Sequence, residues 1–178
     1  DRPQLSYPNI TSGHHADETT HRGAFAMSQS PSPTMFSATD SYAERGADTL
    51  ALAARLLIGW LFLDYGWMKL LGHDGTVRYL ASLHVPMPEL MYWPVMLAEL
   101  VIGIALILGI ATRYTSLFTF VYLIIATAIA HRYWEVPPAA VGAEYANFCK
   151  NLAIMGGTLL LYVLGAGRFS IDARLRRS

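Results

Sequence analysis

Four long apolar segments follow one another along the chain, separated by short polar stretches. They cover residues 49–71, 90–111, 115–131 (or 133) and 146–164. Each is about 17–23 residues long, enough for an α-helix to cross the roughly 30 Å hydrocarbon layer of a bilayer. Buried core helices of a soluble protein are the alternative, but these segments leave almost no polar face to cover a core. The pattern therefore predicts an all-α fold, an integral membrane four-helix bundle.

The connections between the predicted spans differ in length and kind. Between the first two spans, residues 76–83 suit a short helix at the membrane surface that Pro86 and Pro88 would end. A tight turn around residues 112–114 joins the second and third spans, and a loop with two prolines at 137–138 joins the third and fourth. Because there are four crossings, both ends of the bundle's chain lie on one side of the membrane.

Residues 1–47 differ from the rest of the chain. They hold twelve Ser and Thr residues and four Pro but no long apolar run, so they cannot bury enough surface to offset chain entropy. We expect a disordered polar tail there, a four-helix membrane domain over 48–172 and a basic C-terminal end at 173–178. Only 15% of all residues are charged, against about 25% in ordinary soluble domains, which agrees with a membrane protein.

The basic residues indicate which way the bundle is inserted, because loops facing the cytoplasm carry an excess of Lys and Arg. The side that holds both termini carries six arginines: Arg45, Arg113, Arg168, Arg174, Arg176 and Arg177. The opposite side carries Arg78 and Arg132, with Lys69 and Lys150 at its membrane edge. This bias predicts cytoplasmic N- and C-termini.

Composition and motifs exclude several classes of function. Thirteen Lys and Arg residues balance thirteen Asp and Glu, so no net basic field indicates a nucleic-acid partner. The single cysteine, Cys149, excludes an internal disulfide and a Cys-rich zinc or iron–sulfur site. There is no phosphate-binding glycine loop and no His-Glu-x-x-His, and only His131 lies in or beside a span, so we predict neither metal nor haem.

Ionisable side chains inside the spans point to function, since a charge at mid-bilayer costs roughly 2.5–3.5 kcal/mol on insertion scales. Lys69 ends the first span, and Glu99 lies about nine residues into the second span from the same side. His131 leaves the third span on that side, and Lys150 enters the fourth there. We therefore expect four titratable groups from four helices in the outer half of one small bundle.

Three interpretations of this cluster remain open. It is a structural ion-pair network in which Glu99 meets Lys69 or Lys150, a polar pocket open to the outer side, or a pair of snorkelling lysines without contacts. The candidate catalytic residues are Glu99 and His131. The candidate cofactor-binding residues are Lys69, Lys150, Asn151, Asp64 and Arg55.

Several motifs follow one another in a fixed order along the spans. They include Arg55-Leu56-Leu57-Ile58-Gly59, Glu99-Leu100, His131-Arg132-Tyr133-Trp134, Lys150-Asn151-Leu152-Ala153 and Gly165-Ala166-Gly167-Arg168-Phe169-Ser170-Ile171-Asp172. Together they resemble the DoxX family of small bacterial membrane proteins over about residues 48–172. One position departs: many members have His directly before Gly66, where this chain has Tyr65, so a role of that His is not carried over.

The resemblance implies a four-helix protein of the bacterial cytoplasmic (inner) membrane. Relatives are associated with quinone-linked oxidation of thiosulfate, with terminal oxidase complexes and with thiol or oxidative-stress complexes. We therefore expect a membrane subunit of a quinone-linked oxidoreductase system, with quinone as its cofactor and with protein partners in a membrane complex. Glu99 or His131 would exchange protons with a quinone head group. Lys69 and Lys150 would hold an anion, and Arg55 would be a structural partner.

A non-catalytic anchor or assembly subunit is the rival interpretation, in which the bundle and the tail hold a larger complex together. A small transporter is a third, but four spans without inverted repeats or broken helices offer little support for it.

Overall fold

The computed structural model describes residues 35–177, with side chains from residue 44 onward. Six helices make up this part of the chain: α1 (Met35–Leu71), α2 (His73–Ser82), α3 (Pro88–Leu108), α4 (Thr112–Ala130), α5 (Pro138–Leu164) and α6 (Ile171–Leu175). Four of them, α1, α3, α4 and α5, are long and apolar enough to cross a membrane. No strand occurs among the described residues. The predicted all-α membrane bundle is confirmed.

The predicted spans match these helices in order but differ from them at the ends. Helix α1 begins at Met35, so residues 35–47, which we assigned to the polar tail, are helical, whereas residues 1–34 lie outside the described residues. Helix α5 begins at Pro138 rather than at residue 146, because proline suits the first turn of a helix, where its missing N–H is not needed. The short helix predicted at 76–83 is present as α2.

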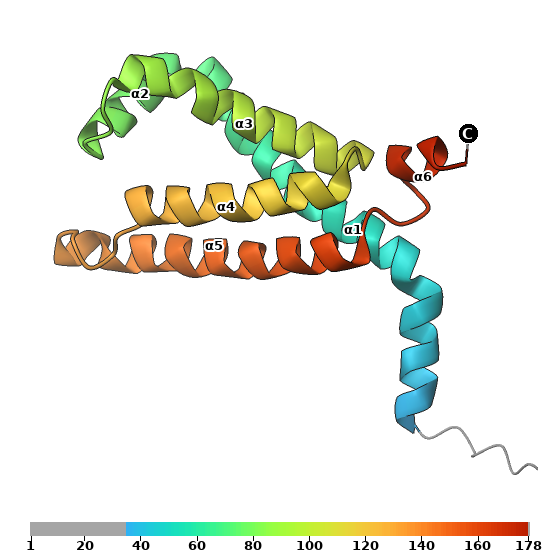
Figure 1. Ribbon diagram of the computed structural model, residues 1–178. Coiled ribbons are helices and arrows are strands. Elements are labelled where there is room, and N and C mark those ends of the chain that lie inside the picture. The colour runs from blue at the N-terminus through green and yellow to red at the C-terminus, as the bar shows by residue number, and fades with distance from the viewer. Residues whose placement is uncertain (1–34, 178) are drawn as a thin grey trace, which may run out of the picture. The chain divides into compact units, whose positions relative to one another are not determined.

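The two ends of the bundle carry different elements (Figure 1). Helices α4 and α5 lie side by side and antiparallel, while α2 lies at one end of the bundle and α6 at the other. We call these the α2 end and the α6 end. At the α2 end, α1 and α4 finish and α3 and α5 begin, so this end gathers side chains from all four spans.

Helices α1 and α3 cross at a contact that only glycine permits. A Cβ atom added to Gly103 would lie 2.6 Å from the backbone nitrogen of Leu63 and 2.9 Å from the carbonyl oxygen of Gly59. Small residues at such crossings let membrane helices approach closely. The buried apolar core lies beside this crossing and consists of Phe62, Ile102, Leu106, Leu123 and Leu161.

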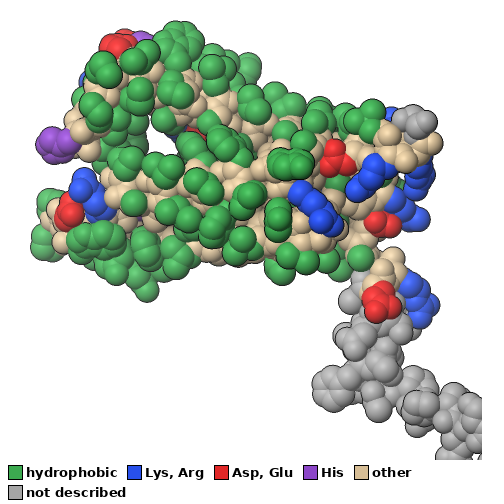
Figure 2. Space-filling view, in the orientation of Figure 1, with side chains coloured by type: hydrophobic (Ala, Val, Ile, Leu, Met, Phe, Trp, Pro, Cys, Tyr) green, Lys and Arg blue, Asp and Glu red, His purple; other side chains and the backbone are tan. Residues whose placement is uncertain are grey.

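The distribution of side chains is the reverse of that in a water-soluble bundle. Hydroxyl side chains occupy much of the buried face of α4: Thr112, Ser116, Thr119 and Thr127. Large apolar side chains instead cover the outside of the bundle, as the green surface in Figure 2 shows. Lipid is as apolar as these side chains, so helix contacts in a membrane depend on small and polar residues instead.

Candidate functional site

Glu99 lies at the centre of a polar cluster near the α2 end. Its side chain is buried, with the residue only 8% exposed, and both carboxylate oxygens accept a hydrogen bond from another helix. Lys69, in the last turn of α1, donates from Nζ to Oε2 at 2.5 Å. Tyr122 of α4 donates its hydroxyl proton to Oε1 at 2.8 Å. A buried charge that is paired and hydrogen-bonded in this way is compatible with the membrane interior.

Lys150 joins this cluster through Tyr65. Its Nζ donates to the Tyr65 hydroxyl at 3.1 Å and to the Oδ1 atom of Asn147 at 3.1 Å. The ammonium groups of Lys150 and Lys69 also lie 5.0 Å and 5.4 Å from the centre of the Tyr65 ring, within the range of cation–π attraction. Tyr65 of α1 therefore lies between the two lysines and links α5 to the pair formed by Lys69 and Glu99.

Asn151 holds α4 and α5 together beside the cluster. Its side chain is buried and donates from Nδ2 to the Thr127 hydroxyl at 2.9 Å. Such hydrogen bonds between polar side chains on neighbouring helices are typical of membrane bundles. Asn151 thus positions the adjacent Lys150 and has its own amide engaged within the protein.

His131 forms a separate pair at the same end. Its Nδ1 atom lies 2.8 Å from Oε2 of Glu144, which belongs to the first turns of α5. Tyr79 of α2 lies near this carboxylate: burial, and secondarily the charge of Glu144, raise the pKa of the Tyr79 phenol. Among the described residues, no hydrogen bond connects the pair of His131 and Glu144 with Glu99.

Two further candidate residues, Asp64 and Arg55, make no contact with this cluster among the described residues, and Arg55 had been predicted as a structural partner. Asp64 is exposed on α1 and has no hydrogen bond or ion pair within the described part of the chain. Arg55 is fully buried and donates to the carbonyl oxygens of Leu106 and Phe169, at the α6 end. The physical reason is helix rise, since Arg55 lies fourteen residues before Lys69 and therefore about 20 Å from it along α1.

Three residues of the site escaped the sequence reasoning: Tyr65, Tyr122 and Glu144. Tyr65 lies four residues before Lys69, and this spacing places both side chains on one helix face. The sequence therefore indicates that Tyr65 can join the site. No such spacing links Tyr122 to another residue of the site. Glu144 was placed in a loop because the fourth span was predicted to begin only at residue 146.

The observed contacts bear on the three interpretations of the polar cluster. Snorkelling without contacts is wrong for both lysines, because each hydrogen-bonds to another helix. The charge of Lys69 is balanced by Glu99, whereas Lys150 has only uncharged partners among the described residues. Figure 2 shows the surface hollowed between the α2–α3 side and the α4–α5 side, with an acidic side chain inside. The ammonium group of Lys150, which has no charged partner among the described residues, can attract an anion or donate a hydrogen bond to a carbonyl group.

Comparison with known proteins agrees with the fold. The DoxX family model matches residues 50–132. The inner membrane protein YphA of Escherichia coli is 38% identical over 125 residues, which covers 70% of this chain and 89% of YphA. The inner membrane protein YqjF of the same organism is 37% identical over 130 residues, which covers 73% of this chain and 95% of YqjF. No solved structure matches.

Within the described residues, no group of three or more His, Cys, Asp or Glu side chains is placed to hold a metal.

Proposed function

Since the chain belongs to the DoxX family, has four helices able to cross a membrane and is 37–38% identical to two inner membrane proteins, we propose that it is a membrane subunit of a quinone-linked oxidoreductase system. The α2 end is the quinone-binding side in this proposal. The observation that supports it is Lys150, a cation that is held by neutral groups beside the buried pair of Lys69 and Glu99.

The side chains around Lys150 fit the head group of a quinone. A quinone ring presents two carbonyl oxygens, so it needs hydrogen-bond donors in otherwise apolar surroundings. Lys150 uses two of its three protons on Tyr65 and Asn147, which leaves one to donate. The Tyr65 hydroxyl accepts from Lys150, so its own proton is free to be donated as well.

A bound quinone supplies chemistry in which two electrons and two protons are taken up or released. The positive charge of Lys150 would stabilise negative charge on the head group. Glu99, held by Lys69 and Tyr122, is the proton-exchanging group next to it. Electrons come from a partner protein or from an oxidisable sulfur substrate.

His131 is proposed to exchange protons between this site and the water outside. It lies at the end of α4 and pairs with Glu144, and the two ring nitrogens of an imidazole allow it to accept a proton on one side and release one on the other. In this role His131 acts through its neighbours and does not touch the quinone. Substitution by Asn would therefore slow proton exchange and shift the pH profile of turnover while leaving quinone affinity nearly unchanged.

Binding of a short-chain ubiquinone to the purified protein in detergent tests the proposal. We expect Lys150→Met to weaken binding by about ten-fold, the loss of one charge-assisted hydrogen bond. We expect Glu99→Gln and Lys69→Met to reduce quinone reductase activity. Arg78→Gln, which changes an exposed cation of α2, is the control and should leave both unchanged. Unchanged quinone affinity and activity in the Glu99, Lys69 and Lys150 variants would refute the assignment.

One observation supports an anchor or assembly subunit as the second candidate. Asp64 is exposed on a membrane-spanning helix and lacks a described partner, and charges there usually meet another charge or a polar group. A neighbouring subunit with a basic side chain would supply one. Asp64→Asn should then release the chain from its native complex during purification, while quinone binding stays intact.

A further inference from the structure

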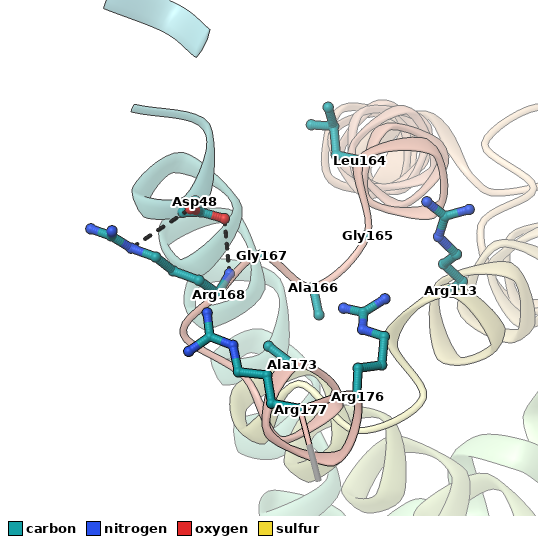
Figure 3. A pocket seen from close by; sticks show the side chains of 10 residues that line it. All are labelled: Asp48, Arg113, Leu164, Gly165, Ala166, Gly167, Arg168, Ala173, Arg176 and Arg177. Atoms are coloured by element: carbon teal, nitrogen blue, oxygen red, sulfur yellow. Dashed lines mark hydrogen bonds and ion pairs between the residues drawn. The ribbon is translucent and has the colours of Figure 1, made fainter. Parts of the chain in front are cut away.

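The α6 end contains a cavity of about 340 Å³ with strongly basic walls (Figure 3). Its charged lining consists of Arg113, Arg168, Arg176, Arg177 and Asp48. The backbone of residues 165–167 forms another wall, and Leu164 lies at its edge. The arginines come from α4, from the segment after α5 and from the end of α6, so the fold gathers cations that are far apart in the sequence.

The positive charges of this cavity are only partly balanced. Asp48 accepts a hydrogen bond from the backbone N–H of Arg168 at 2.8 Å and lies 3.6 Å from its Nε. Arg113 donates to the carbonyl oxygen of Val163 at 3.2 Å, which leaves its charge uncompensated. The side chains of Arg176 and Arg177 make no hydrogen bond or ion pair with any described residue. Four guanidinium groups thus face one carboxylate, and guanidinium groups bind phosphate oxygens particularly well.

The position of the cavity selects the source of the phosphate. It lies where α5 ends and α4 begins, at the ends of two helices that are long and apolar enough to cross a membrane. Beside it, Leu164 is 61% exposed, Val163 is 67% exposed and Tyr114 is 81% exposed, so an apolar surface continues from the cavity along the bundle. A lipid whose phosphate lay in the cavity would have its acyl chains against that surface. Basic pockets beside membrane helices are a known way to bind anionic lipid head groups.

We propose that the cavity at the α6 end binds the phosphate of an anionic membrane lipid. Arg176 and Arg177 hold the phosphate oxygens, Arg113 adds charge from α4, and Asp48 keeps Arg168 fixed at the wall. Binding there ties the segment after α5 to the bilayer and is independent of any quinone at the α2 end.

Titration of the full chain in detergent with short-chain phosphatidylglycerol, followed by native mass spectrometry, tests this proposal. Matched titrations use phosphatidylcholine and inorganic phosphate. We expect phosphatidylglycerol to bind at least ten-fold more tightly than either. Arg176→Gln should weaken its binding by about ten-fold, as expected for one charge-assisted hydrogen bond to an anion.

Arg174→Gln is the matched control, because it removes the same charge from the same short segment but does not line this cavity. It should leave the affinity within about two-fold of the unsubstituted protein, which is far less than one such bond. Equal binding of the two lipids, or equal losses in the two variants, would overturn the proposal. Inorganic phosphate binding as tightly as phosphatidylglycerol would overturn the lipid as the source. Circular dichroism of each variant confirms that the helices are intact.

Discussion

The two ends of the bundle use charged side chains in different ways. At the α6 end, Arg55 donates to backbone carbonyl oxygens, and the Asp172 carboxylate accepts from the backbone N–H groups of Ala111 and Thr112 at 2.7 Å and 2.8 Å. At the α2 end, the charged groups bond to other side chains, as Lys69 does to Glu99. Backbone groups at helix ends have no partner within their own helix, so a side chain that binds them is needed for the fold. A bond between two side chains can instead be replaced by a bond from either side chain to a ligand. The comparison therefore indicates that Arg55 stabilises the fold, and it agrees with the proposal that a ligand binds at the α2 end.

Removing Arg55 is expected to have the largest effect on folding. Arg55→Met removes the side-chain donor to the carbonyl oxygens of Leu106 and Phe169, and it removes a buried cation whose charge interacts with that of Asp172. Loss of one partner from a buried charged network costs roughly 3–5 kcal/mol. Thermal unfolding in detergent measures it. Arg55→Lys should recover only part of the loss, because one ammonium cannot reproduce the guanidinium fork. An unchanged unfolding temperature in Arg55→Met would mean that this end is not held as described.

Breaking the pair at the α2 end should be the next largest effect. Lys69→Met leaves the buried carboxylate of Glu99 with Tyr122 as its remaining donor and should cost about 3 kcal/mol of stability. In the double variant Lys69→Met, Glu99→Gln, the buried charge is gone, so most of that loss should be recovered. Unfolding of both single variants and the double variant gives the coupling energy. Strictly additive losses would show that the two side chains do not act as a pair.

The crossing of α1 and α3, between the two ends, gives an intermediate prediction. In Gly103→Ala the new methyl group would clash with the backbone of Leu63, and separating the helices should cost about 1–3 kcal/mol. Gly156→Ala is the matched control, because no atom lies within 4 Å of the position its Cβ would take. Equal unfolding temperatures for the two variants would rule out the close crossing.

A small pH effect is expected at the surface of α2. A hydrogen bond from His73, and secondarily its charge, lower the pKa of Asp74. A carboxyl group with a lowered pKa in the folded state stabilises that state above its ordinary pKa, and this contribution is lost as pH falls through the lowered value. Asp74→Asn should therefore make the protein slightly less stable at neutral pH, and it should remove the slight loss of stability that the unsubstituted protein shows in that acidic range. Stability measured against pH for both proteins checks the sign.

Much of the fold followed from the sequence, because apolar length alone specifies a membrane helix. The four spans, the short helix α2 and the gathering of Lys69, Glu99 and Lys150 at one end could be predicted from position along each span. The sequence shows how far along a helix each residue lies. The direction in which its side chain points depends on how the helix packs against its neighbours. For this reason the sequence could not show that the side chain of Asp64 has no partner among the described residues.

The remaining contacts depend on segments that approach only in the folded chain. Arg55 meets Phe169, which lies 114 residues away, and nothing in a local pattern indicates such a partner. The cavity at the α6 end likewise needs the segment after α5 to fold back toward α4. The four crossings predicted that these arginines lie on one side of the membrane but not that they surround one space.

Photolabelling with an azido-quinone, followed by mass spectrometry of the cleaved protein, tests the central claim most directly. If the α2 end binds quinone, labels should concentrate on peptides carrying Tyr65 and the start of α5 through Lys150, and excess unlabelled quinone or Lys150→Met should suppress them. Labels spread evenly over the lipid-facing surface, or concentrated at the α6 end and insensitive to Lys150→Met, would contradict the account.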